Sequence, residues 1–356
     1  MRSGYLKATA RYIRQVQLPS GAIPWFPGGI LDPWDHVEAA MGLSVAGFLE
    51  EARAALRWLA RHQRGDGSWM AAYRDGAVID GTRAESNFVA YVATGVWHHH
   101  LITGDHRFLA ELWPTVQAAI AFVLRLQAPT GEIYWALDTR KGISRDALVT
   151  GCSSIYKSLE CAALIAAELG EDPRRIVEAR RRLGECLLQR PEQFDRTWPS
   201  KSRYSMDWFY PVLTGLIRGE AARRRLDRRW NTFVEPGLGC RCVSDRPWVT
   251  VAETCELAMA CIAAGTRHRA QQLFDDLRRY QAEDGSWWTG HAFEDDVLWP
   301  DERPTWTAGA VLLAADALKR ITPASGLFIR HDFDSADALQ HAERPSAGQL
   351  RVQSRR

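Results

Sequence analysis

The chain has 356 residues, of which 46% are hydrophobic and 25% charged, a composition typical of a soluble globular protein with a large core. Its formal net charge of +2 is too balanced to predict binding to nucleic acid or to a membrane surface. The N-terminal stretch lacks a signal-peptide core and no apolar run is long enough for a membrane span, so we expect a cytoplasmic protein. Its seven cysteines are an odd number and form no CxxC pair, which predicts free thiols, no metal and no cofactor.

Two kinds of helical segment alternate along the chain. The first kind carries charged residues on one face and apolar residues on the other, and begins near Leu6, Glu50, His106, Asp172, Glu220 and Arg267. The second kind is apolar on nearly every side, and begins near His36, Ala84, Ser153, Asp207, Thr250 and Thr305. A helix that is apolar all round is buried all round. The alternation therefore predicts an all-α (α/α)6 toroid, with six inner helices inside a ring of six outer helices.

A loop motif recurs where the outer helices end. It pairs Gln with Gly and often Trp, as in Gln63 to Trp69 and Gln281 to Trp287. Recurrence of this kind indicates one structural module used repeatedly. We interpret the motif as structural, with Gln closing an outer helix and Trp closing the loop. Because a closed ring cannot be divided, residues 1–321 should form one domain, and residues 322–356, which lose the periodicity, a loosely ordered C-terminal tail.

The connections differ in length at the two ends of the predicted ring. Links from inner to outer helices are short, with glycine at the helix ends. Links from outer to inner helices are long and cover residues 18–35, 64–83, 128–151, 190–206, 236–249 and 282–304. Loops longer than about 12–15 residues in a compact domain are usually functional. We therefore expect the functional site on this face, at the N-termini of the inner helices.

Polar and aromatic side chains gather at those helix starts. The candidate substrate-binding residues are Trp34, Asp35, Glu38, Asp80, Glu85, Asn87, Tyr156, Lys157, Asp207, Tyr210, Trp248, Glu253 and Trp306. Singly, several of them could be ordinary helix caps or first-turn acids. Together, carboxylates beside aromatic rings suit a sugar pocket, because rings stack on sugar faces and carboxylates accept hydroxyl hydrogen bonds or transfer protons. The pattern predicts a carbohydrate or glycoconjugate as the partner, and leaves the oligomeric state open.

Two segments resemble the six-hairpin glycosidase superfamily, and its glucoamylase-like branch most closely. Residues 103–116, reading TGDHRFLAELWPTV, are similar to a stretch common at one hairpin of that family. Residues 299–307, reading WPDERPTWT, resemble its terminal element, in which a Glu acts as general base. The resemblance implies an inverting glycoside hydrolase with Glu302 as base. It also implies an acid from the third long loop, where Asp138 follows Trp135, and a substrate-binding role for Trp34 and Asp35.

Three alternatives remain open at this point. The Gln–Trp motifs are similar to those of squalene cyclases and protein prenyltransferases, which share the toroid, although the Asp-x-Asp-Asp acid of class II cyclases is missing. A polysaccharide lyase or sugar epimerase on the same ring could use His36, Tyr156 or Lys157 as its base. A non-catalytic glycan-binding relative would retain the pocket without turnover.

Overall fold

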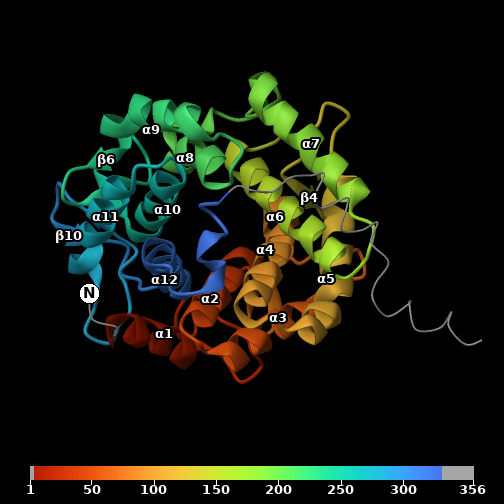
Figure 1. Ribbon diagram of the computed structural model, residues 1–356, viewed down its shortest axis with the longest axis horizontal. Helices are drawn as coiled ribbons and strands as arrows, with labels where there is room; N and C mark the ends of the chain where they lie inside the picture. Colours follow the sequence, from red (N-terminus) through yellow and green to blue (C-terminus); the bar gives the residue numbers. More distant parts are fainter. Residues whose placement is uncertain (1–3, 331–356) are drawn as a thin grey trace, which may run out of the picture.

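The computed structural model describes residues 4–330, which form two concentric rings of helices (Figure 1). The outer helices are α1 (Gly4–Val16), α3 (Leu49–His62), α5 (His106–Arg125), α7 (Arg174–Gln189), α9 (Gly219–Phe233) and α11 (Arg267–Asp276). The inner helices are α2 (Pro33–Val45), α4 (Ser86–Thr103), α6 (Val149–Glu168), α8 (Ser205–Leu213), α10 (Val251–Ala263) and α12 (Thr305–Lys319). Each inner helix packs against the next, and α12 returns to α2, so the inner ring closes. The predicted (α/α)6 toroid is confirmed.

Glycines set the closest approach within the inner ring. A β-carbon on Gly42 of α2 would lie 2.8 Å from the α-carbon of Gly309 on α12, and one on Gly309 would lie 2.6 Å from the Glu38 carbonyl oxygen. Real side chains cannot approach so closely, so only glycine permits this crossing. The contact brings the first turns of α12 against the turn of α2 that carries Glu38.

The Gln–Gly motifs join neighbouring outer helices. The Gln63 amide donates to the carbonyl oxygen of Gly67 in its own loop at 3.0 Å and to that of Thr115 on α5 at 2.9 Å. Gln17 and Gln127 make the same pair of bonds to their own loops and to the next outer helix. At the ring's closure Gln281 bonds Thr9 Oγ1 of α1 instead, at 3.3 Å. The motifs are structural, as the sequence predicted.

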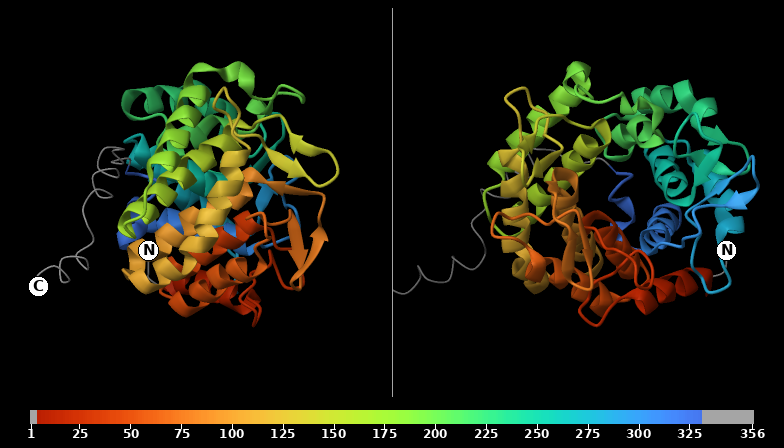
Figure 2. Two further views of the ribbon diagram at one scale, coloured as in Figure 1. Left: turned by 90° about the vertical axis from the view of Figure 1, so that its right-hand side faces the viewer. Right: turned by 180° about the vertical axis from the view of Figure 1, so that it is seen from behind.

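Short strands occupy parts of the long connections, which the sequence analysis treated as loops. They are β1 (Ala72–Arg74), β2 (Ala77–Asp80), β3 (Arg83–Glu85), β4 (Ala136–Asp138), β5 (Gly142–Ser144), β6 (Val234–Glu235), β7 (Gly239–Arg241), β8 (Trp248–Thr250), β9 (Gly290–Ala292) and β10 (Val297–Leu298). All pairing is antiparallel, in sheets β1-β2, β3-β4-β5 and β10-β9-β8-β7-β6. The hairpins project from one face of the ring (Figure 2). We call this face the mouth.

The opposite end of the ring is filled by the chain that follows α12. A short 3-10 helix, η4 (Pro323–Gly326), packs on α12 and α4. Leu327 and Phe328 are buried after it, and this segment lies in the centre of the ring in Figure 1. The expectation of a loose tail from residue 322 is therefore wrong for residues 322–330, whose few apolar side chains showed no periodicity. The remainder of that predicted tail, residues 331–356, lies outside the described residues.

Further short 3-10 segments complete the secondary structure: η1 (Pro191–Gln193), η2 (Lys201–Arg203) and η3 (Leu277–Tyr280). One helix, α5, has the length and apolar composition of a membrane span, but half of it is buried inside the protein and it packs on α4 and α6. An amphipathic outer helix of a toroid has the same length, composition and half-buried surface. The seven cysteines are all free thiols. Cytoplasmic localisation stays a prediction.

Candidate active site

A cavity of about 350 Å³ opens at the mouth, where the inner helices begin. Its wall contains residues from all six inner helices and from the long connections. They are Trp25, Trp34, Asp35, Glu38, Glu85, Asn87, Phe88, Trp135, Leu148, Thr150, Gly151, Met206, Ala252, Glu253, Glu256, Trp306 and Ala310. Within residues 4–330, the lining thus holds five carboxylates and five aromatic rings, with no lysine, arginine or histidine.

Helix α2 places two carboxylates on one wall. The Asp32 side chain caps the helix by accepting the Asp35 backbone N–H at 3.0 Å, and Pro33 supplies a preset first turn. Asp35 and Glu38 are three positions apart, so their side chains share one helix face. That face is turned into the cavity.

Helix α10 places a second pair, Glu253 and Glu256, with the same spacing. The helices α2 and α10 both pack on α12 and flank it in the ring. Carboxylates from two separate walls therefore meet across one space. Glu256 was not predicted from the sequence, although the repeated acid-x-x-Glu spacing in two otherwise apolar helices was a usable signal.

Two tyrosines below the cavity each donate a hydrogen bond to one carboxylate. Tyr91 Oη donates to Glu38 Oε2 at 2.7 Å, and Tyr210 Oη donates to Glu256 Oε1. Beneath them, Lys157 and Phe328 line a small enclosed space shared with both glutamates. The predicted site residue Tyr210 thus supports a carboxylate from below and does not line the main cavity.

Burial away from bulk water is the largest influence on the pKa values of these acids. It raises the pKa of Asp35 well above the ordinary value, and the neighbouring Asp32, Glu38 and Glu256 raise it further. Burial raises the pKa of Glu38 to about 7, against the bond from Tyr91 that lowers it. Burial and the nearby Glu38 also raise the pKa of Glu256, while the Tyr210 hydroxyl lowers it. Such crowding allows one carboxyl to keep a proton at neutral pH beside an ionised one.

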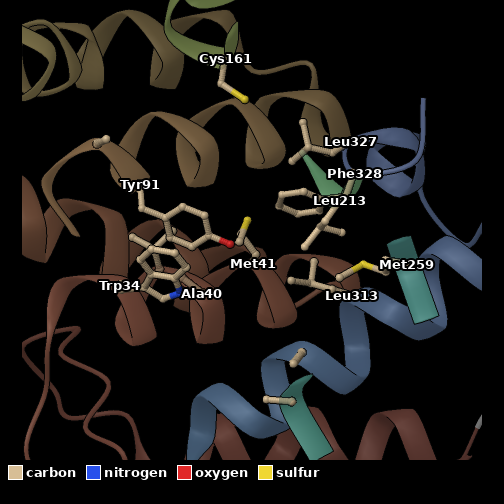
Figure 3. Packing of buried hydrophobic residues seen from close by; sticks show 14 of the residues in the cluster. Trp34, Ala40, Met41, Tyr91, Cys161, Leu213, Met259, Leu313, Leu327 and Phe328 are labelled. Atoms are coloured by element: carbon tan, nitrogen blue, oxygen red, sulfur yellow. The ribbon is translucent and has the colours of Figure 1, made fainter. Parts of the chain in front are cut away.

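Aromatic rings form a further part of the wall. Trp34 stacks on Tyr91 with ring centroids 4.7 Å apart, as seen in Figure 3. Trp25 meets Trp306 edge to face and is held by its N–H bond to Asp32 at 2.8 Å. These contacts fix the planes of rings that the sequence analysis either named, as with Trp34 and Trp306, or missed, as with Trp25.

Glu85 and Asn87 bring the start of α4 to the same cavity. Glu85 is the last residue of β3 and pairs with Ala136 of β4, and its carboxylate holds Arg83 at 2.8 Å. Burial raises the pKa of Glu85, opposed by that guanidinium. Asn87 Oδ1 and Glu253 Oε2 are buried and make no hydrogen bond within residues 4–330, so both acceptors are available for ligand hydroxyls.

The prediction of Asp138 as general acid is wrong. Its carboxylate closes the β4–β5 turn by accepting the backbone N–H groups of Arg140 and Lys141, both at 2.8 Å. Those bonds lower the pKa of Asp138, the opposite of what an acid needs. The other acids of that loop, Glu132 and Asp146, are buried. Glu132 accepts a hydrogen bond from Thr130 Oγ1, and Asp146 accepts the backbone N–H groups of Arg196 and Thr197.

Glu302, which the sequence analysis named as general base, also lies away from the cavity wall. It lies in the connection before α12, its carbonyl oxygen accepts the Thr289 N–H at 3.2 Å, and its side chain is absent from the cavity wall among the described residues. The segment that resembles the family's terminal element thus leads into α12, but the carboxylates that reach the cavity come from α2, from α10 and from Glu85 at the end of β3.

Five other predicted binding residues lie outside the cavity. Asp80 closes a turn with Thr82. The Trp248 ring N–H donates to the Trp299 carbonyl oxygen. Asp207 accepts a hydrogen bond from Thr150 Oγ1 at 2.6 Å and faces a neighbouring cavity. Tyr156 faces α7, with the Arg180 guanidinium 3.8 Å from its ring centre. Lys157 is buried at the floor, where its ammonium pairs with Glu160 at 2.6 Å. The sequence predicted the helix starts to within a few residues. It did not predict the direction in which each side chain points.

The residues suggested for a lyase or epimerase base are likewise turned away. His36 points outward from α2, accepting the Ile23 N–H at Nδ1 and contacting the Ala55 carbonyl oxygen through Nε2 at 2.9 Å. Burial lowers the pKa of His36 to about 4. Among residues 4–330, no three His, Cys, Asp or Glu side chains gather as a metal site.

Comparison with known proteins decides the family. No family model matches the chain. It is, however, 54% identical over 322 residues to the MMP endo-(1,4)-3-O-methyl-α-D-mannosidase of Mycolicibacterium hassiacum, an alignment covering 90% of this chain and 88% of that protein. The chain belongs to the family of this mannosidase. The predicted glycoside hydrolase is thereby confirmed in class, with a glycan as its partner.

Solved structures agree on the fold. A glycosidase in complex with glucose superposes with a TM-score of 0.69 at 15% identity, covering 89% of this chain and 99% of the other. A mannosylglycerate hydrolase from Thermus thermophilus gives 0.65 at 15% identity, covering 86% and 99%, and a D-mannose isomerase gives 0.66 at 12% identity, covering 89% and 98%. At these identities the likeness concerns the toroid alone.

Proposed function

We propose that this glycoside hydrolase cleaves internal α-(1,4) linkages between 3-O-methyl-D-mannose residues. The observation that carries the proposal is the 54% identity with a mannosidase of that name, combined with a cavity lined by carboxylates and indoles. The chain matches that relative over nearly its whole length, so the cavity belongs to the shared part of both proteins.

The chemistry of the lining favours an uncharged, partly methylated sugar. No cationic side chain lines the cavity within the described part of the chain, so a substrate carboxylate, such as that of a glycerate conjugate, would find no partner there. The wall also contains Leu148, Met206, Ala252 and Ala310. Apolar side chains of this kind suit O-methyl groups, which cannot donate a hydrogen bond.

We assign proton donation to Asp35 and water activation to Glu256. A general acid must keep its proton, and the pKa of Asp35 is raised by burial and by three neighbouring carboxylates. A general base must be ionised. Burial and the nearby Glu38 raise the pKa of Glu256, and the Tyr210 hydroxyl bond opposes that rise by stabilising the charged form. Because the two come from different helices, they can flank a glycosidic bond.

The proposed step is a single displacement. Asp35 gives its proton to the glycosidic oxygen as the bond from that oxygen to the anomeric carbon breaks. Glu256 takes a proton from water, whose oxygen attacks the anomeric carbon from the opposite face. The sugar leaves with inverted configuration, and the two carboxyls have exchanged their protonation states. Glu38 and Glu253 bind substrate hydroxyls beside them.

Two variants separate the roles. Asp35→Asn and Glu256→Gln should each lower kcat on an α-(1,4)-linked 3-O-methylmannan by about 10²–10⁴-fold, the usual contribution of a general acid or base. Asp35→Asn should regain activity on an aryl glycoside whose leaving group needs no proton. Glu256→Gln should be rescued by azide, with a glycosyl azide as product. Glu302→Gln, outside the cavity, serves as the matched control.

The assignment is wrong if Glu302→Gln loses turnover while Glu256→Gln keeps it. It is also wrong if azide restores Asp35→Asn in place of Glu256→Gln. Wild-type protein that leaves the methylmannan intact while cleaving an unmethylated mannan would contradict the proposed substrate.

A further inference from the structure

Exposed apolar side chains gather at the tip of one mouth connection. Val297, Leu298 and Trp299 are 46%, 39% and 53% exposed, in the strand β10 and directly after it. Large apolar side chains scattered singly need no explanation, but three in succession beside a second indole indicate a binding surface. The connection precedes α12, whose residues Trp306 and Ala310 line the cavity.

The second indole is that of Trp248, and its position is fixed. Its ring N–H donates to the Trp299 carbonyl oxygen at 2.9 Å, and the two rings meet edge to face with centroids 5.1 Å apart. Its Nε1 also lies 2.7 Å from where a β-carbon on Gly290 would be, so glycine alone leaves room for it. The pair therefore forms a rigid aromatic corner rather than two loose side chains.

This corner is joined to the active site along the chain and through the sheet at the mouth. Trp248 begins β8, which leads directly into α10, and Glu253 of the cavity lies in the first turn of that helix. β8 also pairs with β9, which pairs with β10, so Trp248 lies in one sheet at the mouth and Trp299 directly follows an edge strand of it. A polymer that passes out of the cavity on the α10 and α12 side meets this sheet.

We propose that Trp248 and Trp299, with Val297 and Leu298, form a distal subsite for an O-methylated sugar residue of the polymer. The proposal rests on the proposed function and extends it. Indole faces stack on pyranose rings, and the aliphatic side chains contact methyl ethers, whereas an unmethylated chain would present hydroxyl groups to them. Such a subsite lies away from the reacting bond, so it binds only chains longer than those the cavity holds.

Chain-length dependence tests the subsite. Trp299→Ala should lower kcat/KM on the methylmannan polymer about 3–10-fold, chiefly through KM, and leave kcat/KM on an aryl disaccharide substrate unchanged. Trp299→Phe should restore most of the loss. Ile321→Ala is the matched control, because Ile321 is 45% exposed but follows α12 at the opposite end of the ring.

Each other outcome overturns the proposal in a distinguishable way. Equal losses on the polymer and the disaccharide, or no loss on the polymer, show that the corner is not a distal subsite. A changed molar mass of Trp299→Ala in sedimentation, with unchanged kinetics, assigns the corner to protein association instead. If the wild type cleaves neither substrate, the proposed function fails, and the subsite fails with it.

Discussion

Tyr210 holds Glu256 through its hydroxyl, and this bond favours the ionised form of the proposed base against the effect of burial. Tyr210→Phe removes the donor, so the pKa of Glu256 should rise, because the bond lowers it in the native protein. The base must be ionised to work, so the acidic limb of the kcat/KM profile should move to higher pH by about 1 unit. A pH–rate profile measures this.

A matched control is Tyr280→Phe, which loses a hydroxyl bonded to the Leu238 carbonyl oxygen outside the cavity. Its pH profile should follow the wild type. If Glu256 were the general acid instead, the same rise in its pKa would move the alkaline limb to higher pH and leave the acidic limb in place, and that result would reverse the roles.

His36 couples stability to pH. Its pKa is lowered to about 4 by burial, against an ordinary value of 6.5, so the unfolded chain takes up a proton first as the pH falls. The neutral imidazole therefore stabilises the folded state above pH 6.5, and this stabilisation is lost as the pH falls toward 4. His36→Gln should flatten the slope of unfolding free energy in that window by up to about 1.4 kcal/mol per pH unit.

Urea unfolding at several pH values measures that slope. Glu38 acts in the opposite sense, since its raised pKa favours the folded state below about 7, so the comparison must be between variant and wild type. The exposed His268 provides the control substitution to Gln. An unchanged slope in His36→Gln would show that His36 titrates alike in both states.

At the residue scale, the sequence analysis named Asp35 and Glu253, which lie in helix first turns, and Glu38, one turn after Asp35. It did not name Glu256, one turn after Glu253. Asp138 was favoured by its place after Trp135, and it closes a turn instead. An Asp can serve a turn or a reaction with the same local sequence. Only the direction of the side chain distinguishes them, and helix periodicity fixes that direction where a turn does not.

At the element scale, the Gln–Gly motifs are the strongest link between sequence and fold. Gly67 adopts a φ of +88°, and a β-carbon there would lie 2.2 Å from the Ala118 carbonyl oxygen of α5. Alternation and motif repeat predicted the helices and their order. The β-hairpins escaped prediction because strands of two to four residues carry too little alternation to detect.

Gly67→Ala should accordingly lower the free energy of unfolding by about 2–3 kcal/mol, from the left-handed backbone and from the displaced outer helix. Thermal or urea unfolding measures the loss. Gly65→Ala in the same loop is the control, because a β-carbon there meets no atom within 4 Å. Equal stability of the two variants would contradict a structural role for the motif.

At the scale of the whole molecule, ring closure and the central segment determine where the cavity ends. Gly285 and Trp287 dock on α1, joining the last outer helix to the first. Phe328 then closes the far end beneath Glu38 and Glu256. Within residues 4–330 the site is thus closed at that end and opens at the mouth, and this follows from long-range packing that no local sequence pattern reports.

The central claim is that carboxylates on two facing helices cleave an α-linked methylmannan by a single displacement. Proton NMR of the wild-type reaction, followed from the first turnovers, tests it most directly. The account predicts that the β-anomer appears first and that shorter methylmannan chains accumulate from internal cleavage. Initial release of the α-anomer, or no cleavage of the methylmannan, would contradict it.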